Sequence, residues 1–212
     1  MNSFGIVNFG LFCAAVLLLN ATPGPDTAYI VGRSVAQGRA AGLVSALGIS
    51  VGCLFHCFAS AFGLTALLAT SATAFTAIKL AGGIYLVYLG IRMALAKPAR
   101  PAKAPVMQDV RPLQKIFWQA VVTNILNPKV VLFFLSFFPQ FVLADAQHKT
   151  VAFLLLGATF VAMSTAWNCG TGFLAGTLAR RAGRNPQVKM WLERVVGSAF
   201  VALGVKLATT RH

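Results

Sequence analysis

The chain has 212 residues, of which 58% are hydrophobic and only 10% are charged, and its mean hydropathy is +0.76. A water-soluble globule of this size needs more polar surface, and disordered chains have few aromatic residues, whereas this chain has 17 Phe. The net charge of +14 reflects 18 Lys and Arg against 4 Asp and Glu. Such a charge is typical of binding to nucleic acid or to an acidic membrane surface, so the positions of the charges decide between these partners.

Long stretches without charge divide the sequence into candidate membrane spans. A bilayer core needs about 20 apolar residues per helix. One apolar run alone is equally typical of a buried soluble element, but this many runs in a chain of this length leave no polar surface to cover them. We therefore predict an all-α integral membrane protein with six transmembrane helices, at residues 4–22, 41–67, 74–95, 117–142, 150–174 and 191–209.

The basic residues collect in alternate connections between these helices. The connections after the first, third and fifth predicted helices carry most of the Lys and Arg. Cytoplasmic loops of membrane proteins are enriched in these residues, so we expect both termini on the opposite, outer side. The charge is thereby explained by topology and by contact with anionic lipid, and we expect no nucleic-acid partner.

The predicted helices fall into two groups of three around a basic, proline-rich segment. We predict a first half at residues 1–96, a cytoplasmic linker at 97–115 and a second half at 116–212. Residues 83–92 and 197–206, near the ends of the two halves, each hold two glycines seven positions apart, followed by a basic residue. Because each half has three spans, a true repeat would be inverted across the membrane, as in many secondary transporters.

The first helix of each half contains or adjoins proline. Residues 22–26 are Thr-Pro-Gly-Pro-Asp, and residues 124–129 are Asn-Ile-Leu-Asn-Pro-Lys. Proline removes an amide donor and interrupts the helical hydrogen-bond ladder, so backbone groups are left seeking partners within the membrane. Corresponding broken helices indicate the binding site of a transporter. We expect the two breaks to face one another, the broken-helix residues being Pro23, Gly24, Pro25 and Pro128.

Two charged residues lie at these breaks. Asp26 follows the first and Lys129 follows the second. An ionisable group within a membrane costs about 2.5 to 3.5 kcal/mol on insertion scales, which favours a functional role. A zwitterion with an ammonium and a carboxylate would complement the pair, and Asp26 could also carry a proton. The alternatives are that Asp26 caps a helix beginning at Thr27 and that Lys129 extends to the inner interface.

Further polar residues lie near the breaks or within the second predicted helix. The amides of Asn124 and Asn127 can donate and accept hydrogen bonds beside the second break, and His56 lies midway along its helix. A lone polar side chain in a bundle is also typical of an interhelical hydrogen bond. Cys53, His56 and Cys57 have i, i+3, i+4 spacing, but a tetrahedral metal site needs a fourth donor, so we predict no metal site or cofactor.

Glycine pairs spaced four residues apart occur in two predicted helices. Gly48 and Gly52 form one pair, and Gly172 and Gly176 form the other. Such pairs permit close approach of helices. We expect them to serve packing, either within the chain or in a homodimer.

Several short segments, spread over residues 4–209, occur in a specific order and spacing. They are Ala-Thr-Pro-Gly-Pro-Asp at 21–26, Gly-Arg-Ala-Ala-Gly-Leu at 38–43, Ala-Leu-Gly-Ile-Ser-Val-Gly at 46–52, Gly-Gly-Ile-Tyr-Leu-Val-Tyr-Leu-Gly at 82–90, and Asn-Pro-Lys-Val-Val-Leu-Phe-Phe at 127–134 with Pro-Gln-Phe at 139–141. Together they resemble the LysE/RhtB family of bacterial amino-acid exporters.

This resemblance implies efflux of an amino acid, such as homoserine, threonine, lysine or leucine, from the cytoplasm through the bacterial inner membrane in exchange for protons. With the basic connections in the cytoplasm, both termini are expected in the periplasm. A metal-ion efflux carrier is the alternative function. An enzyme is not expected, because the four acidic residues are scattered and provide no carboxylate cluster or nucleophile with its base.

Overall fold

The computed structural model describes residues 4–71, 73, 77, 80, 84, 88, 91, 110–143 and 145–182. Most of the predicted helix 74–95 and most of the linker 97–115 lie outside the described residues. So do the predicted helix 191–209 and the whole segment 197–206. The count of six helices and the inverted repeat therefore stay predictions.

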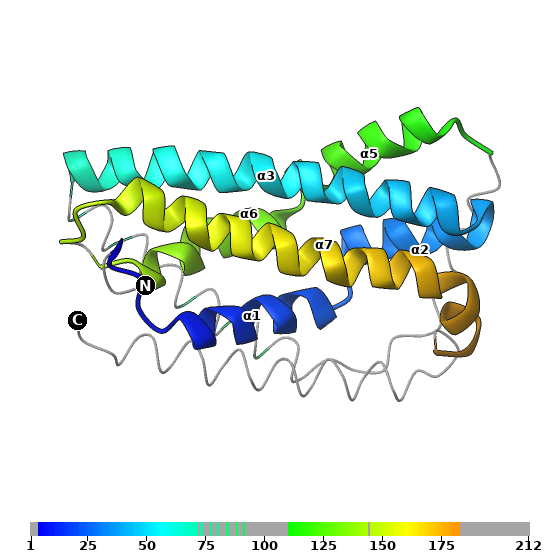
Figure 1. Cartoon of the computed structure of the whole chain (residues 1–212), viewed down its shortest axis with the longest axis horizontal. Helices are drawn as coiled ribbons and strands as arrows, with labels where there is room; N and C mark the ends of the chain where they lie inside the picture. The colour runs from blue at the N-terminus through cyan, green and yellow to red at the C-terminus, as the bar shows by residue number, and fades with distance from the viewer. Residues whose placement is uncertain are drawn as a thin grey trace.

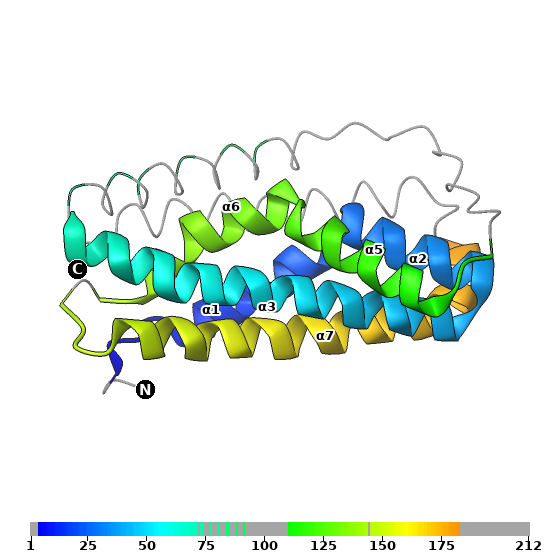
Figure 2. The ribbon, with the colours of Figure 1, turned by 90° about the horizontal axis from the view of Figure 1, so that it is seen from above.

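The described part of the chain is helical. Its elements are α1 (Phe9–Ala21), α2 (Pro25–Gln37), α3 (Arg39–Thr70), α5 (Leu113–Ile125), α6 (Pro128–Phe137), the 3-10 helix η2 (Phe138–Phe141) and α7 (Lys149–Ala182). These residues contain no strand, only an isolated antiparallel bridge between Ile6 and Val142. The long helices α3 and α7 run side by side along the bundle, and the shorter helices lie against them (Figures 1 and 2).

Two of the described helices are long and apolar enough to cross a membrane. The qualifying parts are Arg39–Leu67 of α3 and Lys149–Ala175 of α7. The pair Leu113–Ile125 and Pro128–Phe141, bent by 48°, makes a third span if it is counted as one. Large apolar side chains are exposed along α3, among them Leu47, Val51, Leu54, Phe55, Phe58 and Phe62. An apolar outer surface of this kind suits contact with lipid.

The first predicted span is wrong in its boundaries. The helix α1 begins at Phe9 rather than at residue 4, and residues 22–24 separate it from α2. The helix α2 occupies most of the segment between the predicted spans 4–22 and 41–67, which the sequence predicts to be a basic connection. Its polar side chains lower its hydropathy, so a search for apolar runs passes over it, although Pro25 in its first turn is a normal helix start.

The other boundaries differ less. The helix α3 extends the predicted span 41–67 at both ends, and α7 continues past residue 174 to Ala182. The predicted span 117–142 is two helices and a 3-10 turn, interrupted at residues 126–127. Helices can continue beyond the apolar core because long basic side chains reach the interface, so hydropathy marks only part of each helix.

Small residues allow the helices of this chain to approach closely, as predicted. A Cβ on Gly172 of α7 would lie 2.9 Å from the carbonyl oxygen of Gly42 on α3. The Ser34 hydroxyl of α2 donates to the carbonyl oxygen of Gly172 at 2.6 Å. A Cβ on Gly48 would overlap the backbone of Phe117 on α5. These contacts fix α2 and α5 against the central pair of long helices.

The two ends of the bundle differ in chemistry. The end of α2 and the starts of α3 and α5 lie together, on the right in Figures 1 and 2, and this basic end carries Arg33, Arg39, Arg111 and Lys115. Toward the opposite, aromatic end, a cluster of fully buried rings comes from α1, α6, η2 and α7. Its members are Phe12, Phe133, Phe134, Phe137, Phe138, Phe141 and Phe160.

Candidate functional site

The first break separates α1 from α2 within the bundle. The helix α1 ends at Ala21, and Thr22 donates its N–H to the carbonyl oxygens of Leu18 and Leu19 at 3.1 and 3.3 Å. Gly24 is the N-cap of α2, and no side chain caps that helix. Glycine has no side chain with which to bond the first amides of the helix, so these donors face the break without a side-chain partner.

The second break separates α5 from α6. Asn127 is the N-cap of α6, and its side chain accepts a hydrogen bond from the N–H of Lys129 at 3.1 Å. The N–H of Asn127 donates to the carbonyl oxygen of Asn124 at 3.0 Å. Pro128 occupies the first turn, where its missing N–H removes no helical bond. The structure thus interrupts the helix at residues 126–127, directly before Pro128.

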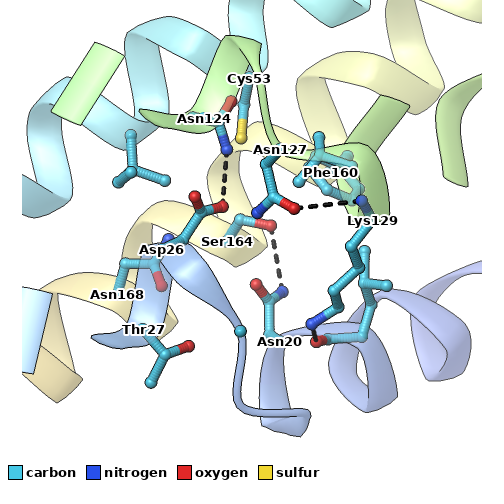
Figure 3. A pocket seen from close by; sticks show the side chains of 14 residues that line it. Asn20, Asp26, Thr27, Cys53, Asn124, Asn127, Lys129, Phe160, Ser164 and Asn168 are labelled. Carbon is cyan, nitrogen blue, oxygen red and sulfur yellow. Dashed lines mark hydrogen bonds between the residues drawn. The ribbon is translucent and has the colours of Figure 1, made fainter. Parts of the chain in front are cut away.

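The two breaks border one cavity of about 30 Å³. A single water needs about 10 to 15 Å³ measured this way, so the cavity is too small for an amino acid in this conformation. Figure 3 shows the polar side chains that converge on it. Its lining consists of Leu19, Asn20, Gly24, Asp26, Thr27, Ile49, Cys53, Asn124, Asn127, Lys129, Val130, Phe160, Ser164 and Asn168.

Asp26 points toward α5. Its Oδ2 accepts a hydrogen bond from Nδ2 of Asn124 at 2.8 Å. Its Oδ1 is buried without a hydrogen-bond partner among the described residues. The alternative that Asp26 caps a helix beginning at Thr27 is wrong, because α2 begins at Pro25 with Gly24 as its cap. A buried carboxylate oxygen without a partner is costly and marks a place where a donor can bind.

Lys129 points toward the end of α1 rather than extending to the interface. Its Nζ donates to the carbonyl oxygens of Leu19 at 2.6 Å and Thr22 at 2.8 Å. These carbonyls lie at the negative end of the α1 dipole, which favours a cation. An ammonium has three donors, so one remains for another acceptor. Lys129 thus joins the second break to the first.

Asp26 and Lys129 line the same cavity without forming an ion pair with each other. Each is held by polar groups of another helix, Asp26 by Asn124 and Lys129 by the end of α1. A negative and a positive group therefore border one space.

The other predicted site residues divide into two groups. Asn124 and Asn127 line the cavity. His56 does not line the cavity. Its Nε2 lies 3.2 Å from the carbonyl oxygen of Asn124, so it contacts the backbone of a lining residue. Among the described residues, no group of three or more His, Cys, Asp and Glu side chains is arranged to hold a metal ion. The metal-carrier alternative is therefore not favoured.

The sequence analysis missed several lining residues. Nδ2 of Asn20 donates to Oγ of Ser164 at 3.0 Å, which connects α1 with α7 beside the cavity. Asn168 lies one turn after Ser164 and also lines the cavity. The available signal was this pair of polar residues four positions apart in a largely apolar helix, where they share one face.

Gly52 lies directly against Asn124, the residue that binds Asp26. A Cβ on Gly52 would lie 2.6 Å from Oδ1 and 2.7 Å from Cβ of Asn124. Overpacking costs about 1 to 3 kcal/mol, which exceeds the helix propensity of about 1 kcal/mol that alanine gains over glycine. We expect Gly52→Ala to lower the unfolding temperature of the purified protein. Gly63→Ala should not, because nothing lies within 4 Å of its Cβ position; equal effects would contradict this account.

Several known proteins resemble this chain over nearly its whole length. The sequence is 28% identical to a leucine efflux protein of Salmonella typhimurium over 209 residues, or 97% of each chain. It is 30% identical to uncharacterized membrane proteins of Pseudomonas aeruginosa, covering 99% of this chain and 98% of the relative, and of Vibrio cholerae, covering 94% and 96%. No solved structure matches. The family model described as "LysE type translocator" matches residues 17–211, and the chain therefore belongs to the LysE type translocator family.

Proposed function

We propose that the protein exports a small neutral amino acid from the cytoplasm in exchange for protons, and that the cavity between the two breaks is the substrate site. The observation that carries this proposal is the placement of Asp26 and Lys129 on one cavity, unpaired with each other. Family membership supports membrane transport, and the relatives named leucine efflux protein support an amino-acid substrate.

The charges of the cavity complement an amino-acid zwitterion. The free Oδ1 of Asp26 accepts the substrate ammonium. The remaining donor of Lys129 and the uncapped first amides of α2 bind the carboxylate. Gly24 lies beside Lys129, since a Cβ there would be in van der Waals contact with Nζ, 3.7 Å away. The site must widen before it can take the whole molecule.

The lining favours a substrate with an uncharged side chain. Asp26 and Lys129 are the charged residues among the described lining. Once they serve the ammonium and the carboxylate, neither is left for a charged substrate side chain, and burial of an unpaired charge is costly. Apolar surface is offered by Leu19, Ile49, Val130 and Phe160. Leucine fits this chemistry better than lysine.

Proton exchange follows from competition at one carboxylate. A proton on Asp26 removes the charge that holds the substrate ammonium, so the group holds either ligand and not both. A carrier that alternates between these states exchanges one for the other across the membrane. We place the basic end toward the cytoplasm of the bacterial inner membrane, with the chain folded as two inverted three-helix halves.

Purified protein in lipid vesicles tests this function. Vesicles preloaded with labelled leucine or lysine receive an imposed pH gradient that is acidic outside, so that protons enter as the amino acid leaves. The initial rate of release is measured. We expect the gradient to accelerate release of leucine. Leucine should move at least about tenfold faster than lysine, because burial of the unpaired lysine side-chain charge costs more than the 1.4 kcal/mol that corresponds to a factor of about ten. Equal rates would contradict the neutral-substrate assignment, and release of leucine that ignores the gradient would contradict proton exchange.

A further inference from the structure

A row of polar side chains joins α2 to α5 between the cavity and the basic end. Asp26, Tyr29, Arg33 and Gln37 have i, i+3, i+7, i+11 spacing and so share one face of α2. Each bonds to α5 or to Arg111, which lies two residues before α5 begins. The contacts are Asn124 Nδ2 to Asp26 Oδ2 at 2.8 Å, Tyr29 Oη to Ile116 O at 3.1 Å and to Gln119 Oε1 at 3.2 Å, Arg33 Nη2 to Gln119 Oε1 at 3.3 Å, and Gln37 Nε2 to Arg111 O at 2.9 Å.

This interface differs from the others that hold the two helices. The helix α2 packs closely on α3 and α7 around Ser34, and α5 packs closely on α3 around Gly48 and Gly52. Between α2 and α5 the contacts of this row are hydrogen bonds. A protein hydrogen bond contributes little net free energy where water can replace its partner. Opening this row to water therefore costs little free energy, because water can replace the lost hydrogen bonds. Opening the buried aromatic cluster would expose apolar rings that form no such bonds with water.

We propose that Asp26, Tyr29, Arg33, Gln37, Asn124 and Gln119, together the α2–α5 zipper, form the gate that closes the cavity toward the basic end. The aromatic cluster closes the opposite side. The zipper begins at Asp26, which also lines the cavity. A ligand ammonium or a proton on that carboxylate weakens its bond to Asn124, so binding at the site loosens the first contact of the gate.

Gln119 is the central residue of the zipper. Its Oε1 lies within hydrogen-bond distance of both the Tyr29 hydroxyl and the Arg33 guanidinium, and it does not line the cavity. Gln119→Leu removes this shared acceptor while keeping a side chain of similar size. Gln119→Glu keeps the acceptor and adds a charge that attracts Arg33. The two variants should therefore act in opposite directions on the gate.

Cys53 provides a reporter inside the cavity. It lines the cavity and is 2% exposed, and the other cysteines, Cys13, Cys57 and Cys169, are not disulfide-bonded. In a background with those three changed to serine, a membrane-impermeant thiol reagent is applied separately to each face of sealed vesicles. Gln119→Leu should raise the rate of Cys53 modification from the basic end by about three- to tenfold. The effect is modest because the single Tyr29 hydroxyl proton can still bond to the carbonyl oxygen of Ile116, so only the bond from Arg33 is lost in full. Gln119→Glu should leave that rate at or below the parent value.

A matched control removes an interhelical hydrogen bond at the other end of the bundle. The hydroxyls of Thr150 on α7 and Thr65 on α3 lie 3.3 Å apart, and Thr150→Val should leave modification from the basic end unchanged. An unchanged rate in Gln119→Leu, or an equal rise from both faces, would overturn the gate. The proposal rests on the proposed function in treating the cavity as a transport site. The assay needs no substrate, so its failure and a failure of amino-acid transport are separate results.

Discussion

Asp26→Asn is expected to slow the efflux of leucine and to abolish its dependence on the pH gradient, while leaving the protein folded. The asparagine oxygen can still accept the hydrogen bond from Asn124, so the contact between α2 and α5 is retained. The charge that holds the substrate ammonium and the group that carries the proton are both lost. A hydrogen bond to a charged group contributes about 1.5 to 3 kcal/mol, so the rate should fall by about ten- to a hundredfold.

The measurement is the initial rate of efflux from vesicles with and without an imposed pH gradient. Asp145→Asn is the matched control, because Asp145 is exposed and outside the cavity. The control should keep both the rate and its response to the gradient. Unfolding temperatures of the two variants should lie close to that of the parent protein. Normal transport with full pH dependence in Asp26→Asn would remove this residue from the site.

The breaks were predictable because they depend on local backbone chemistry. Proline cannot donate a hydrogen bond wherever the chain places it, so Pro25 and Pro128 mark helix starts in the sequence as they do in the structure, and Pro23 lies in the break before α2. The pairing of the breaks needed a further assumption, that corresponding helices meet. The structure brings both to one cavity.

The helix α2 was not predicted, because its place in the bundle depends on contacts with another helix rather than on local backbone chemistry. Its polar residues turn toward α5 and bond there, which makes a helix within the bundle resemble a surface connection to any method that counts apolar residues. The repeat of Asp26, Tyr29, Arg33 and Gln37 on one face was a usable signal. Polar spacing in a short segment of a membrane protein predicts an internal helix better than mean hydropathy does.

The partners of individual side chains could not be predicted. Lys129 binds the carbonyls of α1, and His56 reaches the carbonyl of Asn124; both acceptors are backbone groups that every residue has. Residue type therefore holds no information about these bonds. Asn20 and Ser164 are likewise ordinary residues until α1 and α7 are placed together. Which groups face the cavity is decided by tertiary packing.

Lys129→Met is expected to reduce both stability and transport. It removes two charge-assisted hydrogen bonds to the end of α1 and leaves the Thr22 carbonyl without the Lys129 ammonium. Each such bond contributes about 1.5 to 3 kcal/mol, so the unfolding temperature should fall by several degrees and efflux by at least about tenfold. Lys149→Met, at the start of α7 and outside the cavity, is the control and should change neither.

A structural role and a binding role for Lys129 are separated by a substrate without a carboxylate. Leucinamide keeps the ammonium and the side chain of leucine but offers no anion to Lys129. The parent protein should bind leucine more tightly than leucinamide, measured by competition for labelled leucine. If Lys129 holds the carboxylate, this preference should shrink in Lys129→Met, since the loss falls on leucine alone. A variant that is less stable yet keeps the full preference would confine Lys129 to joining the two breaks, and the carboxylate would then bind at the amides of α2.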